Sequence, residues 1–335
     1  MPQPLVTVIV PTFNRSRYLR AAIDSVFAQS LAEFELIVVD DGSTDETAAM
    51  LAAIRDLRLR VVRHETNRGI AAARNSGLAA ASGKYIAWLD SDDVCRPRRL
   101  AAQVRFLDAH DDVALIGGCA GKIDGHGRRR RGVRIPPFDP AHVRCWLLFK
   151  SAFQQSSVMG RAAILKDTPY DPAFRVCEDI DVFARLVAAG HRLANIPAIL
   201  VDRRMHDGQV SRERRAEVCE AQARISGPQL ASMGVAFAPD ELLRHAALAR
   251  VHRTAPTAEY ICWAEAWLQR LRAANQVTGY VDARALDFVS SYIRFELRRR
   301  SAPVRACGGL ISGAAAGWSA RALPVAARQL LAKGF

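Results

Sequence analysis

Apolar strand-like runs and helical segments alternate through the first ninety residues, and this alternation constrains the fold more than any other feature. Four runs rich in β-branched, aliphatic or aromatic residues predict strands: Val6–Val10, Glu35–Val39, Leu59–Arg63 and Tyr85–Leu89. Helical patterns lie between them at residues 17–29, 44–57 and 71–81, the second with the capping-box spacing of Ser43 and Glu46. Strands and helices joined by short links favour an α/β fold, a mostly parallel sheet with helices on both faces.

Three of the predicted strands end in polar clusters: Pro11–Arg15, Asp40–Gly42 and Asp90–Asp93. In open α/β sheets, ligands bind at the carboxyl ends of the strands. The third cluster places three carboxylates directly after a buried strand, where their mutual repulsion calls for a neutralising partner. Asp90 and Asp92 are two residues apart and point the same way in an extended segment. Carboxylate oxygens suit Mg²⁺ or Mn²⁺, so the cluster predicts a divalent metal that grips a diphosphate.

The second half of the chain changes character near Ser211. Before it, the sequence predicts strands at 113–117 and 156–159, a helix at 180–189, and a strand at 193–201 that is paired or broken at Pro197. Arg128–Arg131 lies between glycines and predicts a solvated loop, with contact to the substrate or to a membrane surface as the alternative. After it, helical apolar faces recur around 216–231, 240–252, 257–273 and 281–297. We therefore predict two domains, 1–211 and 212–335, the second an α-helical C-terminal region.

Charge and cysteine usage limit the partners and the compartment. The net charge of +13 favours anionic partners, which are phosphates, acidic lipids or nucleic acid. No DNA- or RNA-binding motif accompanies the charge, so we expect no nucleic-acid partner. Seven scattered cysteines without a CxxC pair indicate reduced thiols rather than disulfides or a zinc site. With no long apolar run and no signal-peptide pattern, we expect a cytoplasmic protein, with any membrane contact peripheral and at the inner face.

Four motifs in order carry a family resemblance: Val8–Arg15, Val38–Ser43, Asn67–Asn75 and Leu89–Asp93. Together they resemble the family 2 glycosyltransferases, which have the Rossmann-like GT-A fold, and the resemblance covers about residues 5–210. It implies an enzyme that transfers a sugar from a nucleotide-diphosphate donor, with Mn²⁺ or Mg²⁺ as cofactor and usually with inversion at the anomeric carbon.

The resemblance also assigns a donor site. Asp41 matches the carboxylate that accepts a hydrogen bond from the base, which suits uracil, thymine or guanine. Asp92 of the DXD motif is the metal ligand, and Asp90 contacts the donor ribose or the metal's shell. Arg74 reaches the base or the diphosphate, unless it is merely solvated. The full set of donor-binding residues is Pro11, Thr12, Phe13, Asp41, Arg74 and Asp90.

The remaining roles fall in the second half of the same domain. Asp179, in Cys177–Asp181, resembles the family's catalytic base at a helix start, although a plain helix N-cap would look the same. Glu178 and Gln155 resemble acceptor contacts. His206 lies in a segment that closes over the donor, where a histidine ligates the metal or touches phosphate, or is only structural.

The expected function is the addition of one sugar to a hydroxyl of a glycan, lipid-linked or small-molecule acceptor. The Gln-x-x-Arg-Trp motif of processive synthases is absent, which argues against polymerisation. Two alternatives remain: an anionic-surface or nucleic-acid binder, and a catalytically inactive GT-A scaffold. The C-terminal helices pack on the catalytic domain, form a homodimer, or contact a membrane surface through the arginines near residue 298.

Overall fold

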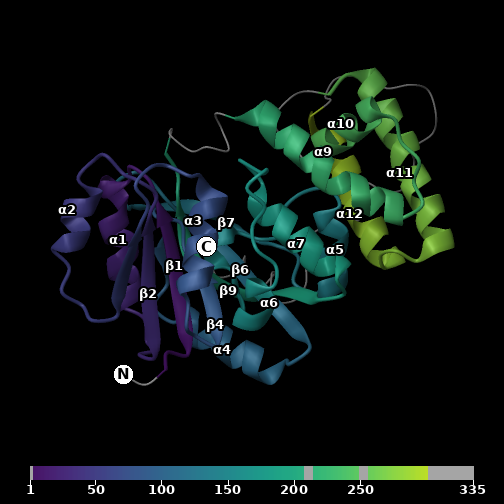
Figure 1. Ribbon diagram of the computed structural model, residues 1–335. Helices are drawn as coiled ribbons and strands as arrows, with labels where there is room; N and C mark the ends of the chain where they lie inside the picture. Colours follow the sequence, from purple (N-terminus) through teal and green to yellow (C-terminus); the bar gives the residue numbers. More distant parts are fainter. Residues whose placement is uncertain (1–2, 207–213, 249–255, 301–335) are drawn as a thin grey trace. The chain divides into compact units, whose positions relative to one another are not determined.

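The computed structural model describes residues 3–206, 214–248 and 256–300, which form two compact units (Figure 1). The first unit contains residues up to 138 together with residues 153–206. The second contains residues 139–152 and the described residues from 214 onward. The predicted boundary between 211 and 212 lies outside the described residues. Residues 139–152, which were expected in the first domain, belong to the second unit, because they pack into its helical core.

The first unit is built on one mixed sheet in the order β3-β2-β1-β4-β8-β6-β9-β5. The first four strands are parallel, β8 runs antiparallel to both of its neighbours, β6 and β9 are parallel, and β7 pairs antiparallel with β6. The strand bounds are β1 Val6–Thr12, β2 Phe34–Asp40, β3 Leu59–Arg63, β4 Tyr85–Trp88, β5 Val94–Cys95, β6 Val113–Ile123, β7 Arg129–Arg134, β8 Met159–Arg161 and β9 Arg192–Arg204.

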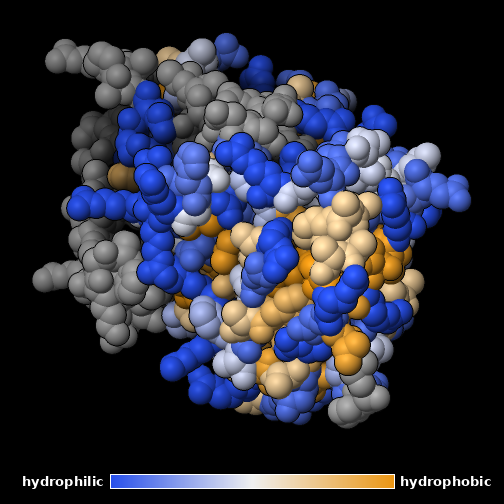
Figure 2. Space-filling view, turned by 90° about the vertical axis from the view of Figure 1, so that its left-hand side faces the viewer, coloured by the Kyte–Doolittle hydropathy of each residue, from blue (hydrophilic) through white to orange (hydrophobic). Residues whose placement is uncertain are grey.

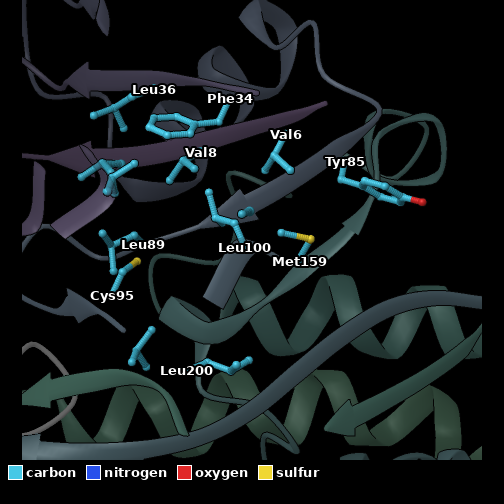
Figure 3. Packing of buried hydrophobic residues seen from close by; sticks show 14 of the residues in the cluster. Val6, Val8, Phe34, Leu36, Tyr85, Leu89, Cys95, Leu100, Met159 and Leu200 are labelled. Carbon is cyan, nitrogen blue, oxygen red and sulfur yellow. The ribbon is translucent and has the colours of Figure 1, made fainter. Parts of the chain in front are cut away.

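Helices cover both faces of this sheet because alternate strand residues point to opposite sides. Val6, Val8 and Leu36 pack in one cluster with residues of α1 and α4, part of which Figure 3 shows. On the opposite face, Ile9 meets α3 so closely that a Cβ at Gly77 would lie 2.4 Å from its Cγ2. The helices are α1 Ser16–Phe27, α2 Thr47–Ala52, α3 Ile70–Ala80, α4 Arg99–Ala109, α6 Ala162–Lys166 and α7 Glu178–Ala188.

The predicted capping box before α2 is wrong, and the helix is shorter than expected. Glu46 is the N-cap residue and makes no side-chain cap, and the helix ends at Ala52 rather than near Leu57. The polar side chains of this segment serve the neighbouring loop instead. Ser43 Oγ accepts a hydrogen bond from the Asn14 amide, and Asp45 accepts from the amides of Ser16 and Thr47. These bonds tie the loop after β1 to the loop after β2.

The arginine run is also placed differently from the prediction. Arg129–Arg131 lie in strand β7 rather than in a solvated loop, because the turn before them closes a hairpin. Asp124 stabilises that turn by accepting from the amides of His126 and Arg128. Strand β9 is continuous past Pro197, and its ladder with β6 shifts register there, so neither a strand pair nor a break is needed.

The second unit is helical and has its own core of Trp267, Leu268, Leu286, Phe149 and neighbouring apolar residues. Its helices are α5 Pro140–Leu147, α9 Arg215–Ser232, α10 Pro239–Leu248, α11 Ala258–Thr278 and α12 Ala283–Arg300. Across the described ranges, none of the helices has the length and apolar content needed to cross a membrane.

Figure 2 shows the face that lies on the left in Figure 1, where hydrophobic residues are interspersed with hydrophilic ones. Among the described residues of the first unit, the large hydrophobic side chains that are exposed are Phe13, Leu57 and Val61.

Candidate active site

The three acidic residues after β4 separate into two environments. Asp93 is only 2% exposed, and it accepts hydrogen bonds from Ser156 Oγ at 2.5 Å and from the Arg204 amide at 2.8 Å. Loss of hydration, with the charges of Asp92 and Asp90 beside it, raises the pKa of Asp93 well above its usual range. Asp93 therefore joins the end of β9 to the end of β4. Ser156 Oγ also lies 2.9 Å from Asp90 Oδ2, while Asp90 stays partly exposed.

Asp92 lies beside the end of β9, where it meets His206. Asp92 Oδ2 is 2.8 Å from His206 Nε2, and both side chains are partly accessible to solvent. The Arg204 guanidinium donates to the Asp92 carbonyl at 2.8 Å, and the Tyr18 ring packs on His206 with centroids 5.2 Å apart. The two predicted metal residues, 114 positions apart in sequence, are thus adjacent. In the described part of the chain, no group of three or more histidine, cysteine or acidic residues forms a metal site.

Arg74, on α3, is buried between two carboxylates. Its Nη1 donates to Glu178 Oε1 at 2.6 Å, and its Nη2 lies 3.3 Å from Asp90 Oδ1. The guanidinium also packs against the rings of Trp88 and Tyr170. Burial lowers the pKa of Arg74, but the nearby carboxylates, Glu178 first, outweigh this and raise it. Arg74 therefore carries a fixed positive charge that connects α7 to the end of β4.

Helix α7 presents two acidic side chains in its first turn. Its N-cap residue is Cys177, which adopts a left-handed conformation with φ of +62° and makes no side-chain cap, so Asp179 is not the N-cap. Burial, opposed by Arg74 and reinforced by Asp179, raises the pKa of Glu178 to about 7. Asp179 accepts a hydrogen bond from the Ile180 amide at 2.9 Å and is half-buried. Asp179 directly follows Glu178, whose carboxylate binds Arg74, and Arg74 in turn lies 3.3 Å from Asp90.

The segment before β8 lines the same region. It forms one 3₁₀ turn, Gln155–Ser157, whose Ser156 contacts Asp90 as described above. Gln155 Nε2 donates to the Tyr170 hydroxyl at 3.1 Å, and Gln154 Oε1 accepts from Arg134 at the same distance. The side-chain oxygen Oε1 of Gln155 is buried and has no hydrogen-bond partner among the described residues. Gln155 is thus near the acidic cluster.

Asp41 is held by donors on three sides. Its Oδ1 accepts from His64 Nδ1 at 2.6 Å and from the Arg68 amide at 3.0 Å, and its Oδ2 accepts from the Gly69 amide at 2.8 Å. His64 Nε2 in turn lies 2.8 Å from Ser76 Oγ. The neighbouring Gly42 has φ of +76°, and a Cβ there would lie 2.6 Å from the backbone of Thr66. Glycine at position 42 therefore lets the loop after β2 approach residues 66–69, whose Arg68 and Gly69 amides bind Asp41.

The Pro11–Phe13 segment begins inside the sheet. Pro11 and Thr12 still pair with β2, so β1 continues past the predicted end at Val10. Phe13 is 40% exposed, and the next residue, Asn14, has φ of +52°. Asn14 Oδ1 accepts from the Thr44 amide at 2.8 Å, which binds this loop to the one that follows Asp41. An exposed aromatic ring thus stands at the same sheet edge as Asp41.

Sequence reasoning missed several residues that this region depends on, chiefly His64, Tyr170 and Arg134. Each contacts a predicted residue that is distant in sequence, so no local spacing could have revealed it. The nearest signal was the predicted acceptor residue Gln155, whose neighbours Gln154 and Ser156 bind Arg134 and Asp90.

Comparison with known proteins identifies the family. The family model "Glycosyl transferase family 2" matches residues 7–168. The succinoglycan biosynthesis protein ExoO of Rhizobium meliloti is 30% identical over 309 residues, which are 89% of this chain and 88% of ExoO. The chain belongs to the family 2 glycosyltransferases. A putative glycosyltransferase of Bacillus subtilis, EpsE, is 36% identical to this enzyme over 59% of the chain and 72% of EpsE.

Solved structures show the same fold. Residues 1–349 of TarS from S. aureus, in complex with UDP-GlcNAc, superpose with a TM-score of 0.59 at 20% identity over 88% of this enzyme and 91% of that chain. The mannosyltransferase PcManGT of Pyrobaculum calidifontis, in complex with GDP-Man and Mn²⁺, gives a TM-score of 0.54 at 19% identity. The match covers 90% of this enzyme and 88% of that chain. The predicted family, enzyme class and GT-A fold are therefore confirmed.

Proposed function

We propose that this glycosyltransferase moves one sugar from a nucleotide-diphosphate donor to an acceptor hydroxyl, with inversion and with a divalent cation. The observation that carries the proposal is the binding of one guanidinium, Arg74, to Glu178 and Asp90, with the Asp92–His206 pair in the same acidic segment as Asp90. Asp179 directly follows Glu178, so the residues proposed to handle the donor and to accept the proton come from neighbouring segments of the fold.

The Asp92–His206 pair fits Mg²⁺ or Mn²⁺. A carboxylate oxygen and an imidazole nitrogen 2.8 Å apart form a two-residue donor set. Mg²⁺ sites commonly use one or two protein ligands and leave the other positions to phosphates and water. Asp92 and His206 would hold the ion. When bound, it would supply positive charge that offsets the charge on the leaving diphosphate. Arg204 orients Asp92 through its carbonyl, and Tyr18 packs on the His206 ring.

Asp179 is proposed as the base that accepts the proton of the acceptor hydroxyl as that oxygen attacks the anomeric carbon. It is half-buried and directly follows Glu178, which binds Arg74. Glu178 is less suited to the role, because its Oε1 is bound to Arg74 at 2.6 Å. We propose that Glu178 positions Arg74 and, with Gln155, contacts the acceptor. Asp90 and Arg74 border the donor's ribose and diphosphate.

The bonds to Asp41 favour a pyrimidine donor base. A carboxylate oxygen offers about two acceptor positions. Oδ1 of Asp41 is filled by His64 and the Arg68 amide, whereas Oδ2 has one donor, the Gly69 amide. A single further N–H can bind, which matches N3–H of uracil or thymine. Guanine presents two adjacent N–H groups that need both oxygens. Phe13 and Pro11 would then border the base, which supports UDP- or dTDP-sugars as donors.

The names of two relatives suggest the acceptor class. ExoO is a succinoglycan biosynthesis protein, and AmsE of Erwinia amylovora, 24% identical over 70% of this chain and 88% of AmsE, is an amylovoran biosynthesis glycosyltransferase. We propose that the acceptor is a growing polysaccharide unit. The six described cysteines are all free thiols, which supports the proposal of a cytoplasmic location.

The experiment that tests the proposal is nucleotide-sugar hydrolysis and transfer by the full chain, with Mn²⁺ and with EDTA. UDP-sugar turnover that depends on Mn²⁺ and is lost in Asp92→Asn and Asp179→Asn supports it. Equal turnover in Mn²⁺ and EDTA would remove the cation from the proposal. Retention of the donor's anomeric configuration, read by NMR of the product, would remove inversion.

A further inference from the structure

Four basic side chains form a row across β7, β6 and β9: Arg130 and Arg134 on β7, Lys122 on β6, and Arg203 on β9. We call these four the basic row. Lys122 is the register partner of both Arg130 and Arg203, and directly opposed residues project from the same face of a sheet. The Lys122 side chain lies over β7, since a Cβ at Gly132 would be 3.3 Å from its Nζ.

Three members of the basic row, Lys122, Arg130 and Arg203, carry little compensating negative charge. Arg130 lies 3.6 Å from Asp124, a weak and exposed pair. In the described ranges, Lys122 and Arg203 make no ion pair with a carboxylate, and Arg134 donates to the Phe153 carbonyl and to Gln154. Positive charges gathered without counter-charges repel one another and attract anions. Loss of hydration and then the charge of Arg203 lower the pKa of Arg134 to about 10.

One end of the basic row reaches the proposed catalytic base. Arg134 binds Phe153 O at 2.8 Å and Gln154 at 3.1 Å. The next two residues of that segment contact Tyr170 and Asp90. Arg134 also feels the charge of Asp179. The row is therefore continuous with the region where the acceptor hydroxyl must be deprotonated.

The basic row is distinct from the groups around the proposed metal ligands. Arg203 and Arg204 are consecutive on β9, so they project from opposite faces of the strand. Arg204 is the one that binds the Asp92 carbonyl. Arg203 consequently faces away from Asp92 and toward the side that holds Arg134. A donor diphosphate held at Asp92 would not account for the row.

We propose that the acceptor carries a phosphate group and that the basic row binds this group, placing the acceptor hydroxyl beside Asp179. This inference rests on the proposed function. Guanidinium and ammonium groups bind phosphate by charge-assisted hydrogen bonds, and guanidinium groups do so in a bidentate manner. The phosphate is not altered in the reaction. It serves as a handle that fixes the acceptor's orientation.

Binding of a phosphorylated probe tests the proposal directly. The full chain, saturated with UDP and Mg²⁺, is titrated with glucose 1-phosphate and with methyl glucoside by ligand-observed NMR. Glucose 1-phosphate is expected to bind about tenfold more tightly than methyl glucoside. Arg203→Gln and Lys122→Gln are each expected to weaken glucose 1-phosphate binding by about fivefold. This loss of affinity should be larger at low salt than at high salt, because salt screens the lost charge.

Arg129→Gln is the matched control. Arg129 lies on the same strand and carries the same charge, but its register partner is Ile123, on the opposite face from Lys122. The Arg129→Gln protein should bind glucose 1-phosphate with the affinity of the wild type. Equal binding of the two probes by the wild type, or equal losses in Arg129→Gln and Arg203→Gln, would overturn the proposal.

A second arm separates a soluble phosphate from a lipid phosphate. Vesicles of phosphatidylcholine with phosphatidic acid are compared with vesicles of phosphatidylcholine alone. Co-flotation that requires phosphatidic acid, Lys122 and Arg203 identifies a lipid-borne phosphate. Binding of glucose 1-phosphate alone identifies a soluble one. If neither glucose 1-phosphate binding nor vesicle binding depends on Lys122 and Arg203, the proposal is overturned.

UDP affinity and UDP-sugar hydrolysis, measured on the same samples, distinguish this inference from the proposed function. A wild-type protein that binds no nucleotide would refute the proposed function. A protein that binds UDP and hydrolyses its sugar, but binds phosphate independently of the basic row, would refute only the phosphate-bearing acceptor.

Discussion

Asp179 and Asp181 offer a matched pair of carboxylates on one helix turn. Asp179→Asn should lower kcat by about 10²–10⁴-fold, because an amide cannot accept the hydroxyl proton. Asp181 pairs with Arg185 at 2.8 Å on the same helix, so Asp181→Asn should keep near wild-type turnover. UDP affinity, measured by calorimetry, should be unchanged in both. A normal kcat in Asp179→Asn would show that another group is the base.

His64 offers a test of whether the free accepting positions of the Asp41 carboxylate decide which nucleotide binds. Wild-type enzyme should bind UDP and dTDP about tenfold more tightly than GDP, because Asp41 has one accepting position left. His64→Leu removes one donor, so it should weaken UDP binding and narrow the preference over GDP. Ser76→Ala keeps the His64–Asp41 bond and should change the ratio little. Calorimetric titration measures all three proteins, and a GDP preference in the wild type would contradict this account of Asp41.

Two helical glycines predict effects of different size at the scale of the elements. A Cβ at Gly77 in α3 would lie 2.4 Å from Ile9 Cγ2, so the helix and the sheet could not keep their spacing. Gly77→Ala should destabilise the first unit by about 1–3 kcal/mol through overpacking. At Gly227 in α9 the nearest atom outside its chain neighbours would be 3.4 Å away, an ordinary contact. Alanine gains helix propensity there, but the Pro228 ring crowds a Cβ on the preceding helical residue, so Gly227→Ala should change stability by less than about 1 kcal/mol. Urea unfolding of both variants checks this difference, and destabilisation of equal size would disprove it.

At the scale of the whole molecule, the two units should respond differently to acid. His245, in the core of the second unit, donates from Nε2 to the Leu148 carbonyl and accepts from Trp267 Nε1 on Nδ1. Burial, slightly opposed by the Leu148 bond, lowers the pKa of His245 to about 4. The pKa of this histidine in the unfolded chain is near 6.5, so between pH 6.5 and 4 the unfolded chain binds a proton that the folded protein does not. The stabilising contribution is thus complete above about pH 6.5 and is lost as pH falls toward 4, amounting to about 3 kcal/mol.

His245→Gln isolates this effect. A glutamine can donate to Leu148 and accept from Trp267 but does not titrate, so thermal unfolding of the second unit should lose its steep dependence between pH 6.5 and 4. His142, whose pKa is raised by Asp139, works in the opposite direction and remains present in both proteins. An unchanged pH profile in His245→Gln would show that another group governs acid unfolding.

The sequence alone determined the family, the fold class and the sheet edge at which the residues proposed to bind the donor lie. Strand alternation and four ordered motifs are local patterns, and parallel strands bring the motifs to one sheet edge whatever the details of packing. The tertiary structure decided what these residues contact. His64 at Asp41, Ser156 between Asp90 and Asp93, and Arg204 at Asp92 are contacts between segments distant in sequence.

The same reason explains the two larger surprises. The arginine run became a strand only because β6 was there to pair with it, and residues 139–152 joined the helical unit because its core accepts Phe149. A sequence window records the propensity of a segment to form a helix, strand or loop. Which partner buries that segment depends on free energies of contact that are spread over the folded chain.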